Sequence, residues 1–378
     1  MKFQVPRDVL AEAVQWTTRS VPQRPAIPIL AGVKIQAADE VLGMSSYDYE
    51  SSAQSTVAAS VEEPGEVLVP GRLLSDISKS FPKQDVTMET RGNQVELSCG
   101  SAHFVLPMMA IDEYPHLPSL PKLRGTVDAK EFATATAQAA IASSNDETLA
   151  ILTGVKVQFE ADKLKFMATD RYRLTYKEIT WQPEDPSFTA DLLVKARVLT
   201  DISKSMTTNG NIQVMVSDEN STGSTLIGFE CEGRQATSSL MDGEYPQVMK
   251  LFPEETPIVA TCSRQDLLDA VSRMSLVVER NTSVRLHFAG SVLRLEAGGQ
   301  GNSAQAQEEI ALSGTDEEFT TAFNPDYLRA GISALKGDYV NFGFTHPSKA
   351  VVITGKAEAD GEIDESFRYL LMPIRIDS

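Results

Sequence analysis

The stretch Val69-Pro-Gly-Arg-Leu-Leu-Ser-Asp-Ile-Ser-Lys-Ser80 returns 125 positions later as Val194-Lys-Ala-Arg-Val-Leu-Thr-Asp-Ile-Ser-Lys-Ser205. Each copy reads as the end of a strand that runs directly into a helix, because apolar residues spaced three and four apart follow a short apolar run. Self-similarity over such a distance is typical of a chain built from duplicated domains.

Further echoes extend this repeat along the chain of 378 residues. Gly32-Val-Lys-Ile35 recurs as Gly154-Val-Lys-Val157, and Asp112-Glu-Tyr-Pro115 recurs as Gly243-Glu-Tyr-Pro246. A third, more diverged copy is carried by Asn324-Pro-Asp-Tyr-Leu-Arg329. The offsets between copies agree with three domains of one fold, which we place at residues 1–122, 123–253 and 254–378.

Within each third we expect two smaller strand–helix units, because Val5-Pro6 precedes one apolar helical pattern as Val69-Pro70 precedes another. Short stretches of alternating apolar residues lie between the helical patterns. Helices among short alternating strands predict α+β domains with mainly antiparallel sheets. The predicted helices are 7–19, 72–83, 130–143, 195–206, 264–280 and 326–338, and the predicted linkers are 119–125 and 250–257.

The composition excludes several classes of protein. No apolar run approaches the roughly 20 residues of a membrane span, and the first residues lack a signal-peptide core. Cys99, Cys231 and Cys262 form no C-x-x-C pair, which is typical of the reducing cytoplasm. Because Cys99 and Cys231 occupy matching places in two repeats, we expect small buried strand residues there.

No catalytic motif is present in the sequence, since the chain lacks G-x-S-x-G, H-E-x-x-H and a Walker P-loop. The four histidines are scattered without the spacing of metal ligands. We therefore expect a non-catalytic protein without a metal or cofactor.

The charge is distributed unevenly along the chain. The net charge is −18, yet the six predicted helices together carry +4, which leaves −22 on the rest. Arg72 and Arg197 hold one helix position in two repeats, and Lys79 and Lys204 hold another. Ordinary solvated helix surfaces explain these cations, but repetition could also gather them around a polyanion.

Two segments are unusual for structure alone. Ala168-Thr-Asp-Arg-Tyr-Arg-Leu174 places arginines on both sides of a tyrosine. The C-terminal segment from Tyr369 is apolar almost to its end, and we expect a terminal edge strand there. Pro373 cannot donate to a strand ladder, and Met372 beside it could belong to an adaptable docking surface.

These residues, in this order and spacing, make the whole chain resemble the bacterial DNA polymerase III beta subunit family, the sliding clamps. The segments that carry the resemblance are the Met1-Lys-Phe3 start, Arg24–Leu30, Ala168–Leu174, Gly243–Pro246 and Leu371–Arg375. The resemblance implies three clamp domains per chain, with helices that line a central pore and antiparallel sheets that form the outer wall. It also implies a homodimer, joined head to tail between domains 1 and 3, that closes as a ring around duplex DNA.

The resemblance further implies a groove between domains 2 and 3 for short apolar peptide motifs of the replicative polymerase alpha subunit, the clamp loader, and translesion and repair proteins. Arg171 and Tyr172 differ from the Gly and His of many relatives. The groove residues carried over to this chain are Leu152, Thr169, Arg171, Tyr172, Arg173, Leu174, Pro246, Lys250, Leu251, Leu370, Leu371, Met372, Pro373, Ile374 and Arg375. The residues assigned to the DNA pore are Arg24, Arg72, Lys79, Arg197 and Lys204.

The implied mechanism is topological, because a closed ring needs only weak, sequence-independent phosphate contacts. Two other classes remain open at this stage. A triplicated scaffold would share the repeat without threading DNA, and an enzyme could use scattered carboxylates.

Overall fold

The computed structural model describes residues 1–206, 210–218, 225–278, 283–298 and 304–375. The chain divides into two compact units. Unit 1 comprises residues 1–133, 181–188 and 198–240, and unit 2 comprises residues 134–180, 189–197 and 241–378.

In the described residues, each third of the chain contains two α-helices and eight or nine strands in a similar order. The first repeat contains β1 (Lys2–Pro6), α1 (Arg7–Thr17), η1 (Thr18–Ser20), η2 (Pro28–Ala31), β2 (Gly32–Ala38), β3 (Val41–Tyr47), β4 (Ser51–Ala58), β5 (Ser60–Glu63), β6 (Gly65–Pro70), α2 (Gly71–Ser80), β7 (Asp85–Arg91), β8 (Gln94–Cys99), β9 (Ala102–Pro107) and η3 (Ile111–Glu113).

The second repeat follows the same order. It contains β10 (Lys122–Asp128), α3 (Ala129–Ala140), η4 (Glu147–Thr153), β11 (Gly154–Glu160), β12 (Lys163–Thr169), β13 (Arg173–Thr180), β14 (Gln182–Pro183), β15 (Ala190–Lys195), α4 (Ala196–Ser205), β16 (Asn211–Val216), β17 (Leu226–Cys231), β18 (Arg234–Ser239) and η5 (Val248–Leu251).

The third repeat completes the described chain. It contains β19 (Ile258–Ser263), α5 (Arg264–Met274), β20 (Val284–Ala289), β21 (Val292–Gly298), β22 (Gln305–Ala311), β23 (Phe319–Phe323), α6 (Pro325–Ala334), β24 (Tyr339–Phe344), β25 (Val351–Lys356) and β26 (Ile363–Leu371). The three predicted α+β domains are therefore present as repeats.

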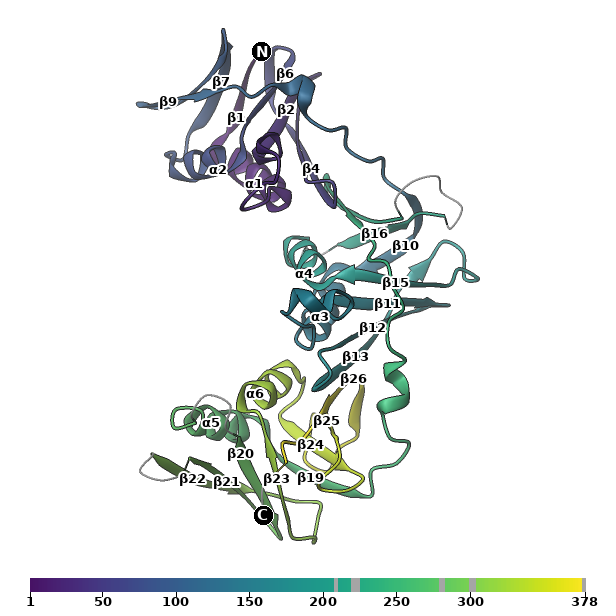
Figure 1. Ribbon diagram of the computed structural model, residues 1–378. Helices are drawn as coiled ribbons and strands as arrows, with labels where there is room; N and C mark the ends of the chain where they lie inside the picture. The colour runs from purple at the N-terminus through teal and green to yellow at the C-terminus, as the bar shows by residue number, and fades with distance from the viewer. Residues whose placement is uncertain (207–209, 219–224, 279–282, 299–303, 376–378) are drawn as a thin grey trace. The chain divides into compact units, whose positions relative to one another are not determined.

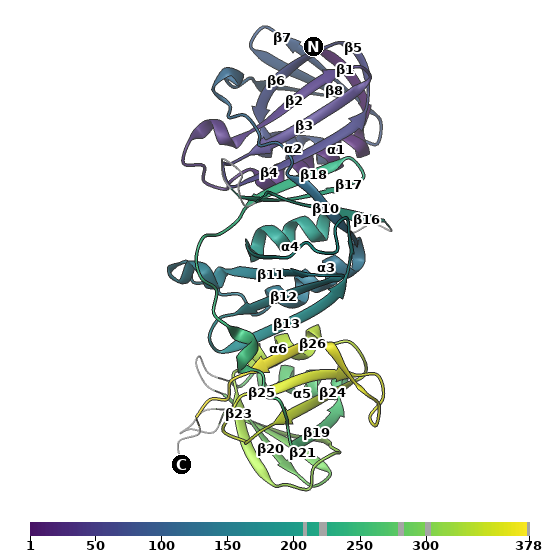
Figure 2. The same ribbon diagram turned by 90° about the vertical axis from the view of Figure 1, so that its right-hand side faces the viewer.

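Unit 1 holds two antiparallel sheets, which Figure 2 shows from the strand side. One sheet has the order β5-β1-β7-β8-β9, and the other has the order β14-β10-β16-β17-β18-β4-β3-β2-β6. The longer sheet crosses from the first repeat to the second at the pair β4–β18, where Ser52 lies opposite Thr237. Helices α1 and α2 pack against each other beside the first-repeat strands (Figure 1).

Unit 2 also contains one longer and one shorter antiparallel sheet. Its longer sheet has the order β15-β11-β12-β13-β26-β25-β24-β19, and its shorter sheet has the order β22-β21-β20-β23. The longer sheet crosses from the second repeat to the third at the pair β13–β26. The C-terminal strand β26 is therefore interior, and the expectation of a terminal edge strand was wrong.

The helices begin where the sequence predicts them, to within one residue, and end one to six residues earlier than predicted. Ser263 caps α5 by accepting a hydrogen bond from the backbone N–H of Asp266, as Ser and Thr commonly do at helix starts. The predicted helix residues 279 and 280 lie outside the described residues.

The predicted linker 119–125 is only partly a linker, because β10 begins at Lys122. Gly125 explains how a strand fits there. A Cβ at this position would lie 2.3 Å from the backbone oxygen of Gln182 on β14, so only glycine allows the close approach.

The cores are aliphatic and aromatic. In unit 1 the first-repeat core contains fully buried Phe3, Leu10 and Ile35, and in unit 2 the third-repeat core contains Phe288, Phe342 and Tyr369. Cys99, Cys231 and Cys262 are buried and form no disulfide. Cys99 and Cys231 end strands β8 and β17, which confirms the expectation of small buried strand residues at these two positions. None of the described helices is long and apolar enough to cross a membrane.

Candidate functional site

The turn between β12 and β13 is the centre of the candidate groove, and all fifteen predicted groove residues belong to unit 2. Thr169 ends β12, and its hydroxyl donates to the Arg173 carbonyl at 2.7 Å. Arg171 adopts a left-handed backbone with φ +80°, which is uncommon for residues other than glycine. Arg171 and Tyr172 thus lie on the turn that connects the paired strands β12 and β13.

Strand β26 brings the C-terminal residues to this turn. Arg173 lies opposite Leu371, and Leu174 lies opposite Leu370. Beyond the strand, the Met372 N–H donates to the Tyr172 carbonyl at 2.9 Å. Two predicted segments that are about 200 residues apart in sequence are therefore adjacent.

An apolar cluster lies beneath these strands. Leu152, Leu174 and Leu370 belong to it, and each is at most 9% exposed. The other fully packed members are Met167, Tyr176, Leu193, Tyr245 and Val248. This cluster forms an apolar floor under the predicted groove residues.

Leu371 is the exception among the predicted leucines. Because side chains alternate along a strand, Leu371 is oriented opposite to Leu370 and packs in the third-repeat core with no exposed surface. It can contribute to a binding surface only through its backbone.

The rim of the site is exposed and partly cationic. Tyr172 is 57% exposed, Leu251 60% and Met372 45%. Lys250 and Leu251 lie on η5, which Val248 anchors in the apolar cluster. The remaining predicted residues are Pro246, Arg171, Ile374 and Arg375, which are exposed, and Pro373, which is half-buried.

Neighbouring groups shift the pKa values of charged residues at and near the turn. Burial lowers the pKa of the Arg173 guanidinium, but Tyr369 and Asp170 raise it by more, so its pKa is raised overall. The pKa of Asp146 is lowered, mainly by hydrogen bonds from Thr148 and in smaller part by Arg171. Arg173 therefore stays protonated beside its carboxylate.

The structure adds residues that the sequence did not single out. Tyr245, inside the repeated Glu-Tyr-Pro segment, accepts the Thr169 N–H at 3.0 Å through its hydroxyl. Burial raises its pKa, so the phenol stays neutral. Tyr327 on α6 lies with its ring centre 4.1 Å from the Arg173 guanidinium carbon, a cation–π distance. The repeated Glu-Tyr-Pro segment could have indicated Tyr245 as a site residue. Nothing in the sequence indicated the contact of Tyr327 with Arg173.

The predicted pore residues are exposed on two helices and one loop. Arg72 and Lys79 lie seven positions apart on α2, and Arg197 and Lys204 lie seven apart on α4. Seven residues are about two helical turns, so each pair shares one helix face. Arg24 is exposed between η1 and η2.

This arrangement has the features of a binding surface. Within the described residues, no group of three or more His, Cys, Asp or Glu side chains could hold a metal ion. An apolar floor with a flexible methionine and cationic rim fits an extended peptide with apolar side chains.

Family models match nearly the whole chain. The N-terminal domain of the DNA polymerase III beta subunit matches residues 1–118, its central domain residues 126–247 and its C-terminal domain residues 249–375. The beta sliding clamp of Streptomyces coelicolor is 43% identical over 376 residues and is covered in full, as is this chain. The beta sliding clamp of Micrococcus luteus is 46% identical over 310 residues, which cover 82% of this chain and 98% of that one. Among solved structures, the sliding clamp of Bacillus subtilis is 26% identical with a TM-score of 0.89 over the full length of both chains.

Proposed function

Because the chain belongs to the DNA polymerase III beta subunit family, it is a sliding clamp, a non-catalytic processivity factor of DNA replication, and we propose that it acts as a homodimeric ring that encircles duplex DNA. The ring would tether polymerases and other partners through the candidate groove. The observation that carries the ring is the pairing pattern of the sheets.

Each junction within the chain uses the same two strands of the repeat. The third strand after the first helix of one repeat pairs with the last strand of the next repeat. Strand β4 pairs with β18 in this way, and β13 pairs with β26. By this rule β22 of the third repeat should pair with β9 of the first, and among the described strands both lie at the edges of their sheets. Unpaired edges are ready templates for another chain. Two copies that pair β22 with β9 head to tail complete the pattern.

One helix position supports the same junction. Arg19, Ile141 and Leu276 each lie twelve residues after the start of the first helix of their repeat. Arg19 donates to the Asp201 carbonyl of the next repeat at 3.2 Å, and Ile141 packs against the core of the third repeat. Leu276 is 84% exposed in the single chain. A second copy would cover it as the next repeat covers its counterparts.

The proposed DNA contacts are electrostatic. Arg24, Arg72, Lys79, Arg197 and Lys204 are exposed on a protein of net charge −18. Cations of this kind bind phosphates without reading sequence. We propose that they face DNA in the pore, while ring closure provides retention and permits sliding.

The partners we propose for the groove are the replicative polymerase alpha subunit, the clamp loader, and translesion and repair proteins, each through a short apolar motif. Tethering raises the effective concentration of a polymerase at the primer end without any new catalytic contact. We place this activity in the cytoplasm, where bacterial DNA is replicated.

The experiment that tests the ring is sedimentation equilibrium across a range of protein concentrations. A mass of twice the 41.2 kDa chain supports the proposal, and a monomer at all micromolar concentrations would refute it.

The groove is tested separately with Met372→Ala combined with Pro373→Ala. Loss of binding to a polymerase tail peptide with the dimer intact is the expected result. Unchanged peptide affinity would contradict the groove assignment.

A further inference from the structure

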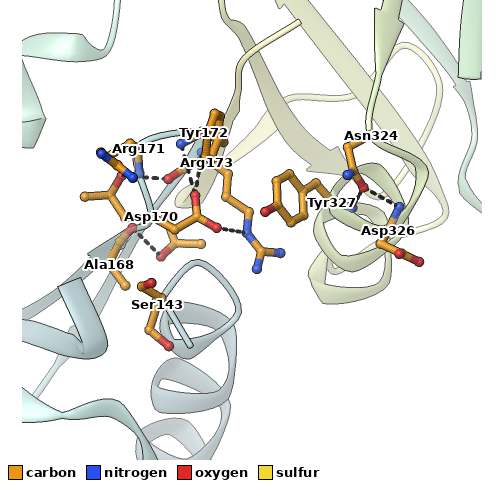
Figure 3. A network of polar contacts seen from close by, with 12 residues as sticks. Ser143, Ala168, Asp170, Arg171, Tyr172, Arg173, Asn324, Asp326 and Tyr327 are labelled. Carbon is orange, nitrogen blue, oxygen red and sulfur yellow. Dashed lines mark hydrogen bonds and ion pairs between the residues drawn. The ribbon is translucent and has the colours of Figure 1, made fainter. Parts of the chain in front are cut away.

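The β12–β13 turn is built around one nearly buried carboxylate. Asp170 is 8% exposed, and its Oδ1 accepts the backbone N–H groups of Tyr172 at 3.0 Å and Arg173 at 3.1 Å. Its Oδ2 accepts the Arg173 Nε–H at 2.8 Å (Figure 3). One side chain thus fixes both the backbone of the turn and the direction of the Arg173 side chain.

The first repeat contains the same turn without the arginine. Asp48 accepts the N–H groups of Glu50 at 3.0 Å and Ser51 at 2.6 Å, and Tyr49 adopts φ +72°. Asp48 and Asp170 are 122 residues apart, which is the offset of the repeat. The turn therefore forms in the first repeat without a counterpart of the Arg173 ion pair, which the second repeat adds.

That addition ties the turn to the third repeat. The Arg173 guanidinium packs over the Tyr327 ring (Figure 3). Helix α6, which carries Tyr327, is capped by Asn324 and held by the Tyr369 hydroxyl, which donates to the Tyr327 carbonyl at 2.9 Å. The same turn also accepts the Met372 N–H. Asp170 thus orients residues that contact α6 and the C-terminal segment.

We propose that Asp170 is a positioning residue for partner binding, which holds Tyr172 and Arg173 against α6 and the C-terminal segment in the geometry that receives a peptide. The inference rests on the proposed function of this site. The Asp170 side chain is nearly buried, so Asp170 acts on a bound peptide through its neighbours. A rim ordered in advance loses less conformational freedom when a peptide binds, which improves affinity.

The test measures the affinity of a fluorescent peptide from the C-terminal tail of a replicative polymerase alpha subunit, by anisotropy, at a temperature well below unfolding. Asp170→Ala should weaken binding about tenfold, because binding would then have to order the Tyr172 and Arg173 side chains. Asp170→Asn keeps the Oδ1 acceptor but loses the charge, so we expect a smaller loss.

Asp48→Ala is the matched control, because it removes the same backbone bonds from a turn that carries no predicted groove residue. It should lower the unfolding temperature as Asp170→Ala does but leave peptide affinity within about twofold. Wild-type affinity in both Asp170 variants, or an equal loss in Asp48→Ala, would overturn the proposal.

A double-mutant cycle with Tyr327→Ala tests the route. If Asp170 acts through Arg173 and Tyr327, the two losses of affinity are less than additive in free energy, whereas independent sites give additive losses. Additive losses would overturn this route. Absence of binding by the unsubstituted protein would instead refute the proposed function of the groove, so the two failures are distinguishable.

Discussion

Leu276 gives a quantitative prediction about ring closure. Its side chain is 84% exposed in the single chain, although its repeat counterpart Ile141 packs against a neighbouring core. If the second copy buries Leu276, then Leu276→Ala removes three carbon groups from the interface. Each buried methylene contributes about 0.8 kcal/mol.

At this exposure, Leu276→Ala should weaken each interface by about 2 kcal/mol. A closed dimer has two equivalent interfaces, so its dissociation free energy should fall by about 4 kcal/mol. That change corresponds to roughly a thousandfold increase in the dimer dissociation constant, since about 1.4 kcal/mol is tenfold.

The assay is sedimentation velocity over a dilution series, with subunit exchange between labelled chains if the parent dimer is too tight to dissociate. Ile363→Ala is the control, because Ile363 is also exposed, at 41%, but begins the interior strand β26. A change in the Leu276→Ala dissociation constant of less than about threefold would refute the repeat-based assignment of this contact.

Three other predictions concern stability. Gly331→Ala should lower the free energy of unfolding by about 1–3 kcal/mol in thermal melts, because the new Cβ would lie 2.3 Å from the ring of buried Tyr369; an unchanged or higher melting temperature would contradict this packing. Arg171→Gly should raise the free energy of unfolding by about 1 kcal/mol in denaturant titrations, because glycine adopts the positive φ of this position without strain. Tyr49→Gly should give a similar gain. A lower free energy of unfolding in both variants would show that the turns are unstrained. Burial raises the pKa of Tyr114 to about 12, against about 10 when unfolded, so its contribution is full below pH 10 and is lost as the pH rises toward 12. Melts from pH 8 to 12 should show this decline, and Tyr114→Phe should make it shallower; identical pH profiles would contradict the assignment.

The repeat made much of the fold predictable. Because Val69–Ser80 and Val194–Ser205 share their apolar spacing, the sequence predicts α2 and α4 and their basic face together. Local periodicity reports which residues face a core, and this is sufficient for elements that pack within one repeat.

Pairing between repeats was not predictable in this way. The apolar C-terminal segment indicates a strand, but nothing local indicates that β26 joins β13, because that choice depends on contacts far apart in sequence. The same limit applies to the site. Leu370 and Leu371 are adjacent residues of the same type. Only the register of β26 shows that Leu370, and not Leu371, belongs to the apolar cluster under the groove. Tyr327 becomes a neighbour of Arg173 only through this pairing.

Retention on DNA tests the central claim most directly. The protein is loaded onto nicked circular DNA with a bacterial clamp loader and ATP, and the bound amount is measured at high salt before and after the circle is cut. Because threading rather than phosphate affinity holds a closed ring, the protein should remain on circles and be lost on linearisation. Equal retention on both forms would contradict topological binding and favour an ordinary scaffold.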